Sequence, residues 1–286
     1  MTIIRLDKNG RIVGQNKGID LSTPGKLVIS GAPIDISPKD AKKIGSGEIG
    51  LHVGITYPRS HKEIDIIGEG VKLHKFVGDV DRINCLKSPV YDPTKGNPLA
   101  YILMGRMWKA PGILPVIMSL KDDALLAATG MPKDRALAAI GGAMAEWNRC
   151  TSGKPFNPQA NLTTNANWKL DHVNNMAFTP YVPGCSAIAA AGVWYKTQGI
   201  PVGTMYPIVE SDMTFNSNMK WTCDPTKEPN KLDFQSVALH ELGHTLGLGD
   251  IYGRDINDGK QVMGYYTGVR RTLGNGDCTA VWKLYG

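Results

Sequence analysis

Residues 240–250 contain two histidines, a glutamate and an aspartate at spacings that suit a catalytic metal ion. His240 and His244 are four residues apart, so on a helix they project from one face, one turn above the other. Two imidazole nitrogens in this arrangement can bind one zinc ion. Glu241 is rotated by about 100° around the helix axis from His240, so it can reach a water molecule without occupying the metal. The H-E-x-x-H pattern therefore predicts a zinc site with Glu241 as general base.

A catalytic zinc site also needs a third protein ligand and one open position. Gly247 follows His244 by three residues, where a glycine can take the positive φ of a sharp turn. Asp250 comes three residues later, so its carboxylate can bind the same ion from the returning chain. Asp255 and Asp258 are alternative ligands, but they lack a glycine placed to make that turn. The alternative to a metal site is a solvated helix face, and the complete spacing argues against it.

The elements that must position these residues are predicted from apolar periodicity and from turn residues. A helix over 233–246 carries the histidines, with Asp233 as its N-cap. A second helix is expected over 131–153, where apolar residues recur at steps of three and four. Strands are expected at 112–120 and 206–216, and a last helix at 276–286.

The first part of the chain has a different texture. Residues 1–95 contain short bursts of Ile and Val separated by Gly and Pro, which predict a small β-rich region. A linker over 96–104, which begins within the turn-rich stretch 87–98, separates this region from a catalytic domain over 105–286. The whole chain is therefore predicted to belong to the α+β class.

Composition and charge exclude several classes of protein. The chain has 286 residues, 42% hydrophobic and 20% charged, which is ordinary globular composition. The net charge of +6 comes from scattered lysines and arginines, so no basic patch predicts nucleic-acid binding. No apolar run approaches the roughly 20 residues that span a bilayer, and the opening segment lacks the apolar core of a secretory signal. Either the numbering starts after a removed signal, or export uses another route, or the protein stays inside the cell.

Five widely spaced cysteines fit no C-x-x-C zinc pattern. Their spacing suits long-range disulfides, which predicts a secreted or extracytoplasmic protein; the alternative is buried thiols in a reducing cytosol. The preferred pairs are Cys223–Cys278 and Cys150–Cys185, although four cysteines allow three connectivities and the sequence cannot choose among them. Cys85 is the cysteine left over.

Several stretches together resemble the metzincin clan of zinc endopeptidases, and most of all the matrixins. They are ESDMTFN (210–216), LDFQSVALHELGHTLGL (232–248), QVMGYY (261–266) and LGNGDCTAVWKLYG (273–286). The resemblance covers about residues 105–286 and implies a twisted mixed sheet, an active-site helix, a Met-turn and a C-terminal helix.

The resemblance also implies roles for single residues. Met263 would form the Met-turn, an apolar floor beneath the metal. Tyr265 would help to stabilise the oxyanion, as in astacin-like and serralysin-like relatives, or else it is a packed aromatic residue. Matrixins normally have histidine where this chain has Asp250, and aspartate there resembles snapalysin-like enzymes. An anionic ligand lowers the effective charge on zinc, so the bound water should be less acidic.

The predicted function is zinc-dependent hydrolysis of peptide bonds in a protein or peptide substrate, by a chain expected to be monomeric. The strand over 206–216 is expected to run above the cleft and to pair with an extended substrate. An inactive zinc-bound binding protein is the alternative from another class. The presence of Glu241 argues against it, because a protein that only binds has no use for a base.

Two roles remain open for residues 1–95. They could form an inhibitory pro-segment, in which the Cys85 thiolate, or less readily Asp79 or Asp81, occupies the open position on zinc. They could instead be a delivery or binding module of a protease toxin. The four other histidines lie outside ligand spacing and are interpreted as ordinary core or surface residues; they are His52, His61, His74 and His172.

Overall fold

The structure is a computed structural model of the chain. It describes residues 2–13, 19–23, 26–29, 32–58, 60–71, 100–109, 114–165, 168–200, 204–251, 260–264 and 268–286.

A ten-stranded mixed sheet runs through the molecule, in the order β11-β10-β12-β14-β13-β6-β7-β1-β2, with β9 paired to β14. Neighbours from β11 to β14 are parallel, whereas β13 is antiparallel both to β14 and to β6. Its strands are β1 (Thr2–Leu6), β2 (Ile12–Val13), β6 (Ile49–Tyr57), β7 (Ser60–Gly68), β9 (Arg106–Met107), β10 (Met118–Lys121), β11 (Asn161–Thr163), β12 (Asn174–Thr179), β13 (Ala189–Lys196) and β14 (Tyr206–Asn216).

Smaller strand pairs and five helices complete the described structure. One small sheet consists of three strands, β3 (Ile19–Thr23), β4 (Lys26–Ile29) and β5 (Ala32–Asp35). Two further sheets are strand pairs: β15 (Trp221–Thr222) with β16 (Leu232–Asp233), and β17 (Leu248–Gly249) with β8 (Ile102–Leu103). The helices are α1 (Pro38–Gly45), α2 (Ala124–Ala128), α3 (Lys133–Arg149), α4 (Phe234–Thr245) and α5 (Asn275–Tyr285). The mixed α+β class is therefore as predicted. No helix within the described ranges has both the length and the apolar character needed to cross a membrane.

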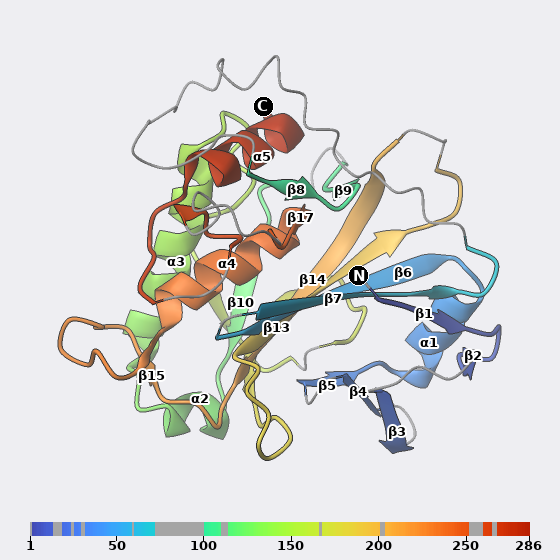
Figure 1. Cartoon of the computed structure of the whole chain (residues 1–286), viewed down its shortest axis with the longest axis horizontal. Helices are drawn as coiled ribbons and strands as arrows, with labels where there is room; N and C mark the ends of the chain where they lie inside the picture. Colours follow the sequence, from blue (N-terminus) through green and yellow to red (C-terminus); the bar gives the residue numbers. More distant parts are fainter. Residues whose placement is uncertain are drawn as a thin grey trace.

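Helices α3, α4 and α5 lie together on one side of the molecule (Figure 1). Helix α3 packs against α4, where the indole of Trp147 donates a hydrogen bond of 2.8 Å to the carbonyl of Leu239. Met144, Trp147 and Phe234 belong to the larger core beneath these helices. This packing fixes α4 across the sheet, with the face that carries its histidines turned toward β13 and β6.

A disulfide joins Cys150 to Cys278, with their Cα atoms 5.0 Å apart. The preferred pairs Cys223–Cys278 and Cys150–Cys185 are therefore wrong. Cys150 is the C-cap of α3 and Cys278 lies in the first turn of α5, and these two helix ends pack together. Spacing along the chain carries no information about that contact. Cys185 and Cys223 are not disulfide-bonded, and Cys85 lies outside the described residues.

The N-terminal strands extend the same sheet. Strands β1, β6 and β7 continue it beyond β13, and Figure 1 shows them on the side away from α3. A second core lies under this part, where Leu51 and Ile64 are buried with Trp168 and Trp194 from later in the chain. Residues on both sides of the predicted linker thus share one sheet and one apolar cluster.

Strand β14 has the bounds of the strand predicted over 206–216. The prediction that this strand runs above the cleft is wrong. It lies in the interior of the sheet, between β12 and β13. Both edges of β14 are therefore used by neighbouring strands, and an extended peptide cannot add to it. Strand β13 is the outermost strand contributed by the C-terminal part, and β6 is paired along it.

Candidate metal centre

Helix α4 begins and ends where the sequence predicts. The Asp233 carboxylate accepts a hydrogen bond from the amide of Ser236 at 3.2 Å and pairs with Arg271 at 2.6 Å. At the other end Gly247 has a φ of +93°, and a Cβ there would lie 2.1 Å from the carbonyl oxygen of Arg106. Only glycine fits this turn without strain and collision. The turn sends the chain back toward the helix and delivers Asp250.

The two helix histidines are held in defined orientations. Nδ1 of His240 lies 2.8 Å from the carbonyl oxygen of Val262, and Nδ1 of His244 lies 2.9 Å from that of Leu248. A carbonyl oxygen can only accept, so each Nδ1 carries the proton. In the neutral rings the lone pair is then on Nε2, and both Nε2 atoms face Asp250. Hydrogen bonds of this kind are typical of metal-binding histidines.

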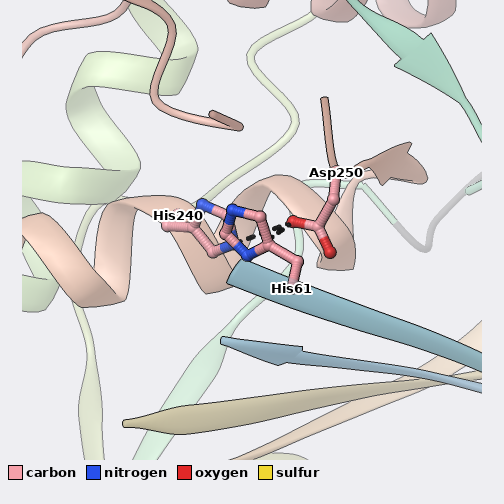
Figure 2. Close-up of side chains that lie close together, drawn as sticks. All are labelled: His61, His240 and Asp250. Carbon is pink, nitrogen blue, oxygen red and sulfur yellow. Dashed lines mark ion pairs between the residues drawn. The ribbon is translucent and has the colours of Figure 1, made fainter. Parts of the chain in front are cut away.

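Three imidazoles converge on one carboxylate oxygen. Oδ1 of Asp250 lies 3.2 Å from Nε2 of His240, 3.4 Å from Nε2 of His244 and 3.3 Å from Nδ1 of His61. His61, His240 and Asp250 form a buried cluster whose ligand atoms all lie within 4.8 Å of one another (Figure 2). The ring of His61 stacks on that of His240 with centroids 4.9 Å apart.

His61 is the residue that the sequence analysis missed. On the sequence alone it is interpreted as an ordinary core or surface residue; in the structure its side chain is fully buried, and its ligand atom clusters with those of His240 and Asp250. His61 comes from β7, in the N-terminal region, so no local spacing relates it to α4. The other described histidines are as expected: His52 is buried against Asp65, and His172 is exposed.

The three distances to Asp250 suit a zinc ion. Four ligand atoms at about 2.0–2.1 Å from zinc in a tetrahedron are about 3.3 Å from one another. The three N–O distances to Asp250 are 3.2, 3.4 and 3.3 Å. Within the described part of the chain, Nε2 of His240, Nε2 of His244 and both Asp250 carboxylate oxygens have no hydrogen-bond partner. Lone pairs facing one another at this distance repel unless a proton or a metal ion lies among them.

The charges of the site also favour a cation. Burial opposes the charged form of His244, but Asp250 outweighs it and raises the pKa of His244 to about 9. Burial likewise opposes ionisation of Asp250, yet His244 and His61 hold the pKa of Asp250 well below its usual range. Burial lowers the pKa of His61 to about 4, which leaves that ring neutral and able to donate a lone pair. A carboxylate among imidazoles thus attracts a positive charge, which a metal ion can supply.

Glu241 lies beside the cluster with the properties of a general base. It is fully buried, and neither carboxylate oxygen has a hydrogen-bond partner among the described residues. Burial raises the pKa of Glu241, and His240 and His244 partly offset that rise. A carboxylate with a raised pKa can take and return a proton near neutral pH.

Met263 packs directly against α4. A Cβ added to Gly243 would lie 2.2 Å from the sulfur of Met263, so the two residues are in close contact. The backbone around Met263 is held by the buried Asp277 of α5, which accepts from the amides of Val262 at 2.6 Å and Met263 at 3.2 Å. Asp277 therefore fixes the loop that also orients His240, and the sequence analysis did not single it out.

Several predicted site residues cannot be placed. Two of them are Tyr265, the predicted oxyanion residue, and Cys85, the predicted latency ligand; both lie outside the described residues. So do the carboxylates that were named as alternatives, which are Asp79, Asp81, Asp255 and Asp258. His74 lies outside them as well.

Comparison with known proteins gives two matches. Residues 195–286 match the family described as Matrixin, a stretch that contains α4, the Gly247 turn and α5. Karilysin of Tannerella forsythia is 46% identical over 56 residues, which is 19% of this chain and 11% of karilysin. The aligned part thus spans about a tenth of the length of that relative.

The helix with its two histidines and glutamate, the glycine turn and the aspartate all lie within residues 195–286, the stretch that is similar to the matrixins.

Proposed function

We propose that this chain is a zinc-dependent endopeptidase in which His240, His244 and Asp250 hold the ion and Glu241 is the general base. One observation carries the proposal. The Nε2 atoms of the two helix histidines face the same Asp250 oxygen, at 3.2 and 3.4 Å, next to a buried glutamate. The match of this segment to a family of metalloproteases supports it.

In the proposed reaction Glu241 moves the proton. When bound, the zinc ion polarises a water molecule and the scissile carbonyl, which makes the water a better nucleophile. Glu241 removes the proton from that water and then delivers it to the leaving amine. Its burial favours this second step, because a carboxyl group with a raised pKa holds a proton long enough to pass it on. Tyr265 is retained as a proposed oxyanion donor.

The edge of β13 is the proposed place for the substrate backbone. β13 is the outermost strand that residues 105–286 contribute to the sheet, and α4 packs beneath it. An extended peptide that added a strand there would pass over His244 and Glu241. The chain's own strand β6 lies at this edge.

We place the protein outside the cytoplasm. The Cys150–Cys278 disulfide supports this proposal, because such bonds persist in oxidising compartments. Residues 1–95 are proposed to keep the enzyme latent. Strands β1, β2, β6 and β7 complete the same sheet, which favours this role over an independent delivery module.

The test compares the wild type with Glu241→Gln on a peptide mixture derived from a proteome, read by mass spectrometry. Bound zinc is measured in both proteins. We expect cleavage by the wild type after its N-terminal region has been released, and none by Glu241→Gln at equal zinc content. Cleavage by a folded, zinc-loaded Glu241→Gln protein would refute the assignment of the base.

A further inference from the structure

We propose that His61 is a fourth protein ligand of the metal and that the β6–β7 hairpin occupies the substrate's place on β13. The hairpin consists of β6 (Ile49–Tyr57) and β7 (Ser60–Gly68). The chain described here is then the latent form of the enzyme. This inference rests on the proposed peptidase function and states how the hairpin keeps the peptidase inactive.

Strand β6 uses the whole edge of β13. The pairing is antiparallel and runs from Ala189 opposite Thr56 to Lys196 opposite Ile49. Backbone hydrogen bonds of a sheet edge can serve only one partner at a time. A substrate peptide could therefore reach this edge only after β6 has left it.

The same strand covers the catalytic groups. A Cβ on Gly54 of β6 would lie 2.7 Å from Nε2 of His244, the nitrogen that faces the metal position. The bare backbone at Gly54 thus fits into space that a substrate carbonyl would need.

Strand β7 supplies the ligand itself. Nδ1 of His61 lies 3.3 Å from Oδ1 of Asp250, the same spacing that the two helix histidines show. Glu63, on the same strand, accepts a hydrogen bond of 2.9 Å from the amide of Asp250. Catalytic zinc sites keep one position open for water, whereas sites with four protein ligands are closed. His61 lies in one cluster with His240 and Asp250, and His244 lies 3.4 Å from the same Asp250 oxygen, so His61 would be the fourth protein ligand.

A buried charge network anchors the hairpin. Asp65 of β7 pairs with Arg106 of β9 and lies 3.3 Å from Nδ1 of His52 and 3.3 Å from the hydroxyl of Tyr195. The guanidinium of Arg106 also lies 4.1 Å from the centre of the Tyr195 ring. These contacts and the backbone hydrogen bonds between β6 and β13 must break together when the hairpin leaves. Cleavage of the chain after β7 is the step that would release the hairpin.

The first test counts imidazole ligands by X-ray absorption at the zinc edge. It uses the full chain carrying Glu241→Gln, which prevents self-cleavage. We expect three imidazoles, with one fewer in His61→Ala and no change in the control His172→Ala, an exposed histidine. If the spectrum of the chain with His61 intact shows two imidazoles and a water oxygen bound to zinc, the proposal is overturned. That measurement needs no His61 variant, so a folding defect in His61→Ala does not remove the test.

The second test measures binding of a peptide hydroxamate by calorimetry, in the same background. A recognition sequence for a site-specific protease is placed after Val71, and binding is compared before and after cutting. We expect cutting and release of the hairpin to tighten binding by at least about tenfold, since apparent affinity scales with the fraction of open sites. Equal affinity before and after release would contradict the inhibitory role. Absence of zinc from every form would instead refute the proposed function.

Discussion

Nδ1 of His61 lies 3.3 Å from Oδ1 of Asp250, although His61 belongs to a strand of the N-terminal region and Asp250 follows the turn after α4. This contact joins the two parts of the chain at the place where the chemistry is expected.

The Gly247 turn should be intolerant of any side chain. Gly247→Ala meets both a φ of +93° and a backbone oxygen 2.1 Å from the new Cβ, so we expect a loss of about 2–4 kcal/mol in unfolding free energy. Zinc affinity should fall with it, because the turn delivers Asp250. The matched control is Gly130→Ala, whose φ is +74° with nothing within 4 Å of the Cβ. Denaturant titration of both variants checks this, and equal losses would show that the contact with Arg106 does not matter.

The disulfide should contribute to stability. Cys150→Ser combined with Cys278→Ser removes the link between α3 and α5, and we expect a loss of about 2–5 kcal/mol in unfolding free energy. Cys223→Ser removes a thiol that is not disulfide-bonded and is the control. A thermal melt of each variant, with and without reductant, measures the difference. If reductant leaves the melting temperature of the wild type unchanged, the result would contradict a stabilising disulfide.

The network around Asp65 should hold the hairpin closed. Asp65→Asn leaves the buried Arg106 without its charge partner, which costs about 3–5 kcal/mol for buried pairs. We expect faster hydrogen exchange of the β6 amides than in the wild type, measured by mass spectrometry. Lys133→Met breaks the exposed pair with Asp122 and should leave the exchange of β6 unchanged. Unchanged protection of β6 in Asp65→Asn would show that the network does not anchor it.

Stability should fall with rising pH through a buried carboxyl group of β14. Burial raises the pKa of Asp212 to about 8, from an ordinary value of 3.8. The folded state therefore keeps a proton that the unfolded state loses, so stability declines between those two pH values by up to about 1.4 kcal/mol per pH unit. Asp212→Asn should make this decline less steep, with the remainder due to Glu210, whose pKa burial raises to about 9. Asp224→Asn, at an exposed carboxylate, should keep the full decline. Unfolding free energies at pH 5, 6.5 and 8 make the comparison, and parallel profiles for wild type and Asp212→Asn would contradict it.

Much of the site could be predicted because its residues are local in the chain. His240, Glu241 and His244 lie within two turns of α4, and Gly247 and Asp250 follow at offsets that a single turn sets. Helix periodicity and glycine's backbone freedom relate such residues to one another without knowledge of the rest of the fold.

The parts that could not be predicted depend on contacts between distant segments. His61 reaches the site only because β6 pairs with β13 and brings β7 alongside. That β14 is an interior strand follows from the order of the sheet, which the pattern of one strand does not contain. The Cys150–Cys278 pairing likewise depends on which helix ends pack together.

The central claim is that one zinc ion is held by the α4 histidines and Asp250, and equilibrium dialysis with elemental analysis tests it most directly. The full chain should retain one zinc ion per molecule. Glu241→Gln should retain the same amount, while His240→Ala and Asp250→Ala should lose most of it at matched free zinc. A wild-type chain that binds no zinc, or variants that bind it as tightly as the wild type, would contradict the claim.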